Sequence, residues 1–187
     1  MSETINSFFR KIITLNEIGN DDPYSFNDPD GVKSGKSGWS FGGVQWDTQN
    51  NSIALDCLRK CGFTEAEIKG LVTQSINVKP LEAKLKAGAS IIDGYDEKQL
   101  QHCLNAAGEF VSTFGVPVET SGLLAIADTV NQYGSVGSGS AASLLKMNKT
   151  ITNEDVLAMK LTWKYSKTKR GKADTIRRAN NITRVLG

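Results

Sequence analysis

Apolar residues near the N-terminus recur at the spacing of one helical face. They follow an i, i+3, i+4, i+7, i+8 pattern, which predicts an amphipathic helix. Glycine is common just beyond a helix C-terminus, so we expect this helix to end near Gly19. The apolar positions are Ile5, Phe8, Phe9, Ile12 and Ile13.

Residues 20–51 break this pattern. They are rich in Gly, Asp, Asn and Ser and carry isolated aromatic residues. Such a composition predicts loop, with a short hairpin at about 39–46. We therefore expect a small loop and hairpin lobe at about 20–51.

The helical pattern returns after this lobe and continues to the C-terminus. Thr64 with Glu67, and Thr152 with Asp155, have the spacing of a capping box at a helix start. The stretch 121–134 is apolar enough to be a central buried helix. Further helices are expected at 52–61, at 80–87, at 96–114 behind a cap at Asp96, at 141–147 and at 172–185, with a flexible loop at 134–140.

Length and composition indicate one globular domain, 1–187, of mainly α class. The chain has 187 residues, 39% apolar and 22% charged, with neither an internal repeat nor a linker. It has no apolar run long enough to span a membrane. Arg10 and Lys11 interrupt the apolar N-terminus, so we expect no signal peptide and synthesis in the cytoplasm.

Charge is distributed unevenly along the chain. The segment 160–187 has nine Lys or Arg and one acid, which leaves thirteen basic and nineteen acidic residues in 1–159. A basic C-terminal segment suits an anionic partner such as nucleic acid, teichoic acid or a phospholipid surface. The alternative is a solvated helical hairpin without a partner.

The cysteines and the single histidine do not form a metal-binding pattern. Cys57 and Cys61 are four residues apart on a predicted helix, and His102 adjoins Cys103. A structural zinc site is normally built from paired ligand motifs at defined spacing, which this chain lacks. We expect no disulfide framework, no metal and no cofactor.

Glu17 is a candidate general acid. It lies one turn after Ile13, at the edge of the predicted buried face, where loss of solvent favours a protonated carboxyl group. Acidic residues in the following loop could supply the second carboxylate of a glycosidase, or could simply form turns. A calcium-loop pattern fails, because Phe26 would occupy its first ligand position. The loop acids are Asp21, Asp22, Asp28, Asp30 and Asp47.

The segment FGGVQWD, 41–47, resembles FGLMQVD of goose-type lysozymes and, more loosely, the GLMQ segment of bacterial lytic transglycosylases. The resemblance implies a lysozyme-like α+β fold with a cleft beside the lobe. It makes Glu17 the general acid, Gln45 a cleft residue and Asp47 the residue that positions water. DTVNQYGSVGSGS is similar to the AYNAG segment of that family, which implies that Asn131 and Tyr133 contact the substrate.

This chain departs from the family in several places. GGV replaces GLM, Ile18 follows the glutamate, and Asp30 has no aligned counterpart although it is a candidate second carboxylate. Phage lysozymes, in which an acidic helix precedes a Gly-rich hairpin, are also similar, and they put Ser40 in the place of a catalytic threonine. Trp39 is the expected sugar contact. In an extended strand Gln45 and Asp47 would share one face, with Trp46 on the other.

These resemblances imply a muramidase that cleaves the β-1,4 bond between N-acetylmuramic acid and N-acetylglucosamine in peptidoglycan. A lytic transglycosylase that leaves anhydro products is the alternative. We expect a monomer that acts on the cell wall after release, as a phage endolysin or an injected bacteriolytic effector. The basic end would contact the anionic envelope, and no specific nucleic acid is expected. A non-enzymatic helical nucleic-acid-binding or virion protein, and a cleft that binds glycans without cleaving them, remain open.

Overall fold

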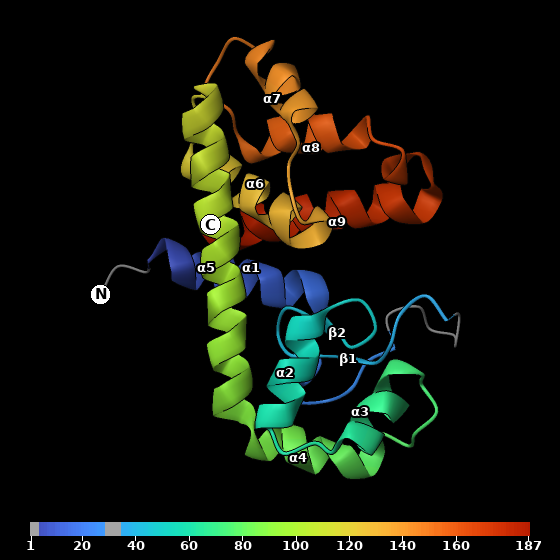
Figure 1. Ribbon diagram of the computed structural model, residues 1–187. Coiled ribbons are helices and arrows are strands. Elements are labelled where there is room, and N and C mark those ends of the chain that lie inside the picture. The colour runs from blue at the N-terminus through green and yellow to red at the C-terminus, as the bar shows by residue number, and fades with distance from the viewer. Residues whose placement is uncertain (1–3, 29–34) are drawn as a thin grey trace. The chain divides into compact units, whose positions relative to one another are not determined.

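The computed structural model describes residues 4–28 and 35–187. Over these residues the protein is 66% helix and 4% strand, which confirms the mainly α prediction (Figure 1). The elements are α1 Ile5–Glu17, β1 Ser40–Phe41, β2 Trp46–Asp47, α2 Ser52–Lys60, α3 Glu65–Val72, the 3₁₀ turn η1 Lys79–Leu81, α4 Glu82–Ala87, α5 Ala89–Phe114, α6 Thr120–Tyr133, α7 Ser138–Leu145, α8 Asn153–Leu161, the 3₁₀ turn η2 Tyr165–Lys167 and α9 Lys169–Leu186.

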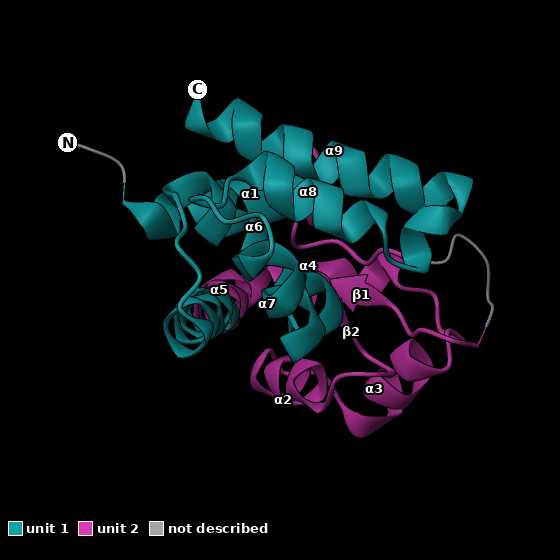
Figure 2. Ribbon diagram, turned by 90° about the horizontal axis from the view of Figure 1, so that it is seen from above, with its two compact units in different colours: residues 1–16, 99–187 teal, residues 17–98 magenta. Residues whose placement is uncertain are grey.

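The chain folds as two compact units (Figure 2). Unit 1 joins the N-terminal segment, through Asn16, to Gln99–Gly187, and unit 2 is Glu17–Lys98. Helix α1 therefore belongs with the C-terminal helices, although the whole of unit 2 follows it in the sequence. Its last residue, Glu17, stands at the boundary between the units.

Helix α6 is the core of unit 1, as its apolar sequence predicts. Its buried residues lie on every side of the helix, and it packs against α8 and α9. Gly122 lies so close to the backbone of Ile151, just before α8, that an added Cβ would come within 2.4 Å of the Ile151 carbonyl oxygen. The buried apolar side chains of α6 are Leu124, Ala125, Ile126, Ala127 and Val130.

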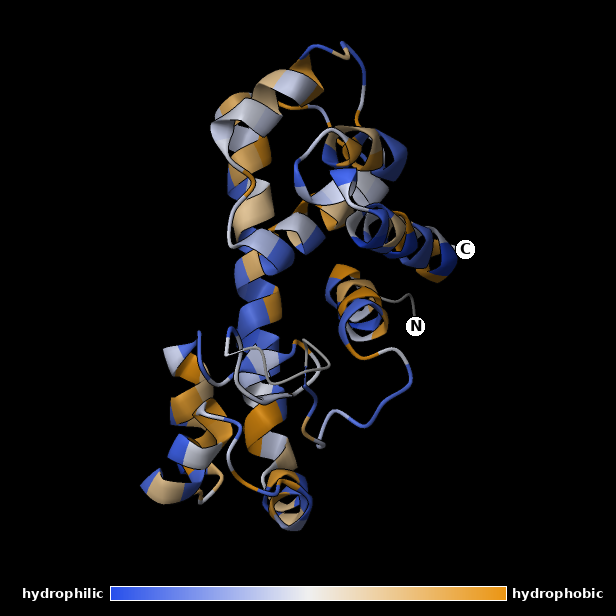
Figure 3. Ribbon diagram, turned by 90° about the vertical axis from the view of Figure 1, so that its right-hand side faces the viewer, coloured by the Kyte–Doolittle hydropathy of each residue, from blue (hydrophilic) through white to orange (hydrophobic). Residues whose placement is uncertain are grey.

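Helix α1 carries both apolar and polar residues, as the N-terminal pattern predicts (Figure 3). Phe9, Ile12 and Ile13 are almost fully buried. The helix ends at Glu17, and Gly19 follows with a φ of 63°, a left-handed conformation that glycine adopts without strain. Both predicted capping boxes form, at α3 and at α8.

Two predicted boundaries are wrong. Asp96 does not cap a helix, because α5 begins at Ala89 and Asp96 is buried in its interior. An interior carboxylate is tolerated there because it accepts hydrogen bonds from the hairpin, which the local sequence does not reveal. The expected loop at 134–140 is also shorter, because α7 already begins at Ser138. Within residues 4–28 and 35–187, no helix is long and apolar enough to cross a membrane.

Candidate functional site

The C-terminal turn of α1 carries Glu17, which is partly buried. Asn16, just before it, is 4% exposed. The Asn16 side chain donates to Asp128 Oδ1 at 2.9 Å and accepts from Asn181 Nδ2 at 2.9 Å. The side chain next to Glu17 is therefore held by α6 and by α9.

Arg177 of α9 holds the backbone of the same turn. Its guanidinium donates to the carbonyl oxygens of Leu15 at 3.3 Å and Asn16 at 2.9 Å. The last carbonyls of a helix lack intrahelical partners and carry partial negative charge, so a guanidinium both satisfies and stabilises them. Asp174 in turn accepts from Arg177 at 2.5 Å. Side chains from two helices thus fix the end of α1.

A buried charge cluster lies behind this turn. It comprises Asp128, Arg178 and Lys160, which are 1%, 4% and 4% exposed. Arg178 donates to both Asp128 carboxylate oxygens, Nε to Oδ2 at 3.0 Å and Nη2 to Oδ1 at 2.6 Å. Lys160 Nζ lies 3.5 Å from Asp128 Oδ2 and donates to Gln132 Oε1 at 2.9 Å. The cluster joins α6, α8 and α9, and Asn16 extends it to α1.

Burial and pairing act in opposite directions on the charges of this cluster. Burial alone would raise the pKa of Asp128, but the Arg178 and Lys160 cations outweigh it and hold that pKa below its usual value. Burial lowers the pKa of Lys160, and the Asp128 carboxylate opposes this only in part. Asp128 is therefore a carboxylate that stays ionised because two cations surround it.

The predicted hairpin forms in unit 2, with Ser40 paired to Asp47 and Phe41 paired to Trp46. Trp46 is 3% exposed, and its Nε1 donates to Asp96 Oδ1 at 2.7 Å. Gly43 N donates to the other oxygen of Asp96, also at 2.7 Å. One buried carboxylate of α5 therefore fixes both the turn and the second strand.

Gln45 lies in the turn of the hairpin. Its φ is 59°, and its side-chain amide donates to the Gly42 carbonyl at 3.1 Å. The extended geometry that would put Gln45 and Asp47 on one face therefore does not apply at Gln45.

Asp47 shapes the base of the hairpin. Its Oδ1 accepts from the backbone amides of Gly38 at 3.0 Å, Gln49 at 2.8 Å and Asn50 at 3.3 Å. Its Oδ2 accepts from Asn50 Nδ2 at 2.7 Å. Both oxygens are thus engaged with the chain itself.

The other unit 2 candidates differ in how accessible they are. Ser40 is 1% exposed, and its backbone pairs with Asn27 as well as Asp47. Trp39 is half-buried, and its Nε1 is buried with no hydrogen-bond partner among the described residues. Asp30 lies outside the described residues.

Asn131 and Tyr133 are at the C-terminal end of α6, in unit 1. Asn131 Oδ1 accepts a weak hydrogen bond from Cys103 Sγ at 3.9 Å. Tyr133 is 40% exposed, and its ring meets those of Trp163 and Tyr165 edge to face. The sequence prediction omits Trp163, although a tryptophan in a polar, basic segment is a usable signal for a binding surface.

Metal binding has no support among the described residues. Across residues 4–28 and 35–187, no group of three His, Cys, Asp or Glu side chains could hold a metal ion. His102 is exposed on α5, and Cys57 is buried on α2.

Comparison of the chain with protein-family models, with curated proteins and with solved structures returns no match.

Proposed function

We propose that this protein cleaves the glycan strands of peptidoglycan, with Glu17 as the general acid. The observation that carries the proposal is the convergence of α6 and α9 on the last turn of α1. Asp128 and Asn181 hold the Asn16 side chain, and Arg177 holds two carbonyls of the turn. An ordinary surface glutamate needs no such support, whereas a general acid must be held in position against its substrate.

In the proposed reaction, protonated Glu17 donates its proton to the glycosidic oxygen as the bond to the anomeric carbon breaks. A water molecule then attacks the anomeric carbon and gives up a proton to the Glu17 carboxylate, which restores the acid and leaves a reducing end. The resemblance of FGGVQWD to the goose-type lysozyme segment supports the β-1,4 bond after N-acetylmuramic acid as the target.

A lytic transglycosylase is the second candidate, and the contacts of Asp47 favour it. Asp47 Oδ1 accepts three hydrogen bonds, from Gly38, Gln49 and Asn50, and Oδ2 accepts one from Asn50, so the carboxylate is fixed against the hairpin and only Oδ2 keeps a lone pair for a water molecule. When a hydroxyl group of the substrate attacks in place of water, one carboxylate is sufficient. The product then carries an anhydro ring.

The test is the loss of turbidity of a purified peptidoglycan suspension, followed by mass analysis of the fragments. Glu17→Gln should lower the rate by about 10²–10⁴-fold, the usual contribution of a general acid, and leave thermal unfolding unchanged. Glu109→Gln, at an exposed site on α5, is the matched control and should retain full activity. Undiminished lysis by Glu17→Gln would refute the assignment. Fragments lighter by one water would identify a transglycosylase.

A further inference from the structure

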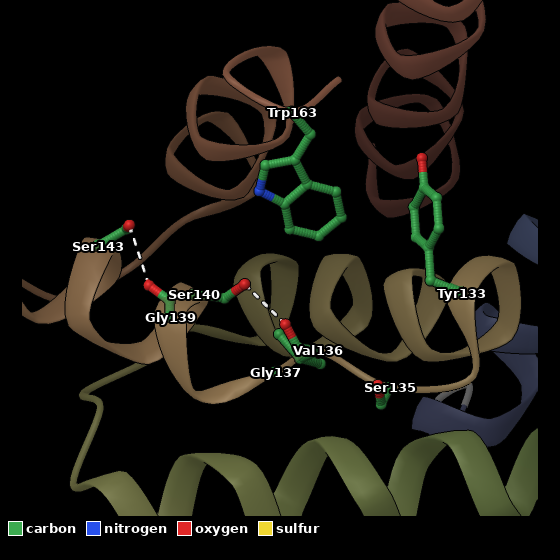
Figure 4. A pocket seen from close by; sticks show the side chains of 8 residues that line it. All are labelled: Tyr133, Ser135, Val136, Gly137, Gly139, Ser140, Ser143 and Trp163. Carbon is green, nitrogen blue, oxygen red and sulfur yellow. Dashed lines mark hydrogen bonds between the residues drawn. The ribbon is translucent and has the colours of Figure 1, made fainter. Parts of the chain in front are cut away.

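Unit 1 contains a pocket of about 420 Å³ between the C-terminal end of α6, the start of α7 and the segment after α8 (Figure 4). Its volume lies within the range of about 300–1,000 Å³ that is typical of small-ligand sites. Only Tyr133, among the residues that line it, is a predicted substrate contact.

Two aromatic side chains form one side of the pocket. The rings of Tyr133 and Trp163 have their centroids 5.2 Å apart and planes at 75°. Tyr133 is 40% exposed and Trp163 is partly exposed, so ring surface remains accessible. Flat, amphipathic rings of this kind offer an apolar face to the C–H groups of a ligand and a polar edge to its hydroxyls.

Serine hydroxyls from α7 form part of the opposite side, as Figure 4 shows. Ser140 Oγ donates to the Val136 carbonyl at 2.7 Å, and Ser143 Oγ donates to the Gly139 carbonyl at 3.1 Å. Because each hydroxyl proton is already used, each oxygen is left to act as an acceptor. The pocket therefore combines apolar ring surface with acceptors for O–H and N–H groups.

The lining of the pocket is uncharged, and the buried Lys160 ammonium lies behind it, 5.7 Å from the Tyr133 ring centroid. Every described residue that lines the pocket has an uncharged side chain. Burial raises the pKa of Tyr133, and Tyr165 adds to the effect, so its phenol stays protonated. A neutral lining disfavours phosphates, nucleic acids and metal ions, which require compensating charge.

We propose that this pocket binds a neutral N-acetylhexosamine ring of a glycan, stacked on Trp163 and hydrogen-bonded to the serines of α7. Such a ring has an apolar C–H face and a rim of hydroxyl and amide donors, which match the two sides of the pocket. The choice of a sugar rests on the pocket, and the choice of an N-acetylhexosamine rests on the proposed function.

The experiment titrates ¹⁵N-labelled Glu17→Gln protein with the N-acetylglucosamine tetramer and follows the tryptophan indole N–H resonances. The chain has three tryptophans, and Trp163→Phe assigns one resonance to Trp163. We expect the Trp163 resonance to shift and saturate. Trp163→Ala should weaken binding about tenfold, equivalent to about 1.4 kcal/mol.

Matched variants separate stacking from other effects. Phe114→Ala removes another aromatic ring, 39% exposed and outside the pocket, and should bind normally. Ser143→Ala removes one acceptor at an exposed position and should weaken binding several-fold. Lys164→Gln removes the charge next to Trp163 and should change nothing for a neutral ligand.

Three outcomes overturn the inference: an unmoved Trp163 resonance, binding by Trp163→Ala that equals that of the parent, or loss of binding in Lys164→Gln. Failure of the proposed function has a different signature. A saturable Trp163 shift in a protein that does not lyse peptidoglycan would support the pocket and refute catalysis. Lysis that depends on Glu17, without a shift of the Trp163 resonance, would support catalysis and refute the pocket.

Discussion

Asp128 is predicted to contribute strongly to the stability of unit 1. It is 1% exposed and pairs with Arg178 and Lys160, and it accepts the Asn16 amide. Asp128→Asn would leave two buried cations without a counter-charge, which typically costs about 3–5 kcal/mol. We expect this loss in the free energy of unfolding, measured by urea denaturation.

Asp174→Asn is the control for that substitution. Asp174 also pairs with an arginine, Arg177, but the side chains of this pair are 22% and 45% exposed, so solvent screens the interaction. Its loss should cost at most about 1 kcal/mol. Equal destabilisation by the two variants would show that burial of Asp128 does not decide its contribution.

The lowered pKa of Asp128 predicts how the free energy of unfolding depends on pH. The pKa of Asp128 is lowered in the folded protein, from an ordinary value of 3.8. Its contribution is therefore complete above pH 3.8 and is lost as the pH falls from 3.8 through the folded pKa, because the unfolded chain then binds more protons. Asp128→Asn should remove this acid-dependent part of the unfolding curve.

At the scale of elements, α9 combines a structural face with a cationic N-terminal end. Arg178 is buried in the charge cluster, and Arg177 supports α1. Its first turn carries basic side chains and no acid, which the helix dipole disfavours. These basic side chains therefore lower the stability of the helix, and we interpret them as a binding surface for an anionic partner. The exposed basic residues at the start of α9 are Lys169, Arg170 and Lys172.

Replacing these three exposed residues with glutamine should weaken lysis of whole cells several-fold. Lysis of purified peptidoglycan should change little, because anionic lipids and teichoic acids are absent from it. The thermal midpoint should stay the same or rise slightly, because the substitutions relieve the unfavourable interaction with the dipole. Equal losses in both lysis assays would contradict an envelope-binding role.

At the scale of the whole molecule, unit 1 is assembled from both ends of the chain. Phe9, Ile12 and Ile13 of α1 are buried, and Asn16 joins the charge cluster. A chain that starts at Glu17 should therefore lose cooperative folding of unit 1. Hydrogen exchange of the α6 amides measures this, and these amides should become fast.

Two further results bear on that prediction. Adding a peptide of residues 1–16 in trans should restore part of the protection, because it supplies the same buried side chains. Full protection of α6 in the shortened chain, without the peptide, would show that α1 contributes nothing to unit 1.

The sequence by itself determined those features that depend on neighbouring residues. The apolar spacing of α1, the capping boxes at Thr64 and Thr152, and the buried character of α6 are all confirmed. Their physical basis lies within a few turns of the chain, since helical faces and caps are formed by residues three or four positions apart. Glu17 was singled out by the same local reasoning.

Only the tertiary structure decided where the buried charges and the pocket lie. Asp96, Asp128 and Arg178 are of residue types that are usually exposed, and each is buried with a partner at least fifty positions away. Trp163 and Tyr133 meet because α6 and α8 pack together. Burial of a charge is favourable only when a distant partner satisfies it, and local sequence carries no record of that partner.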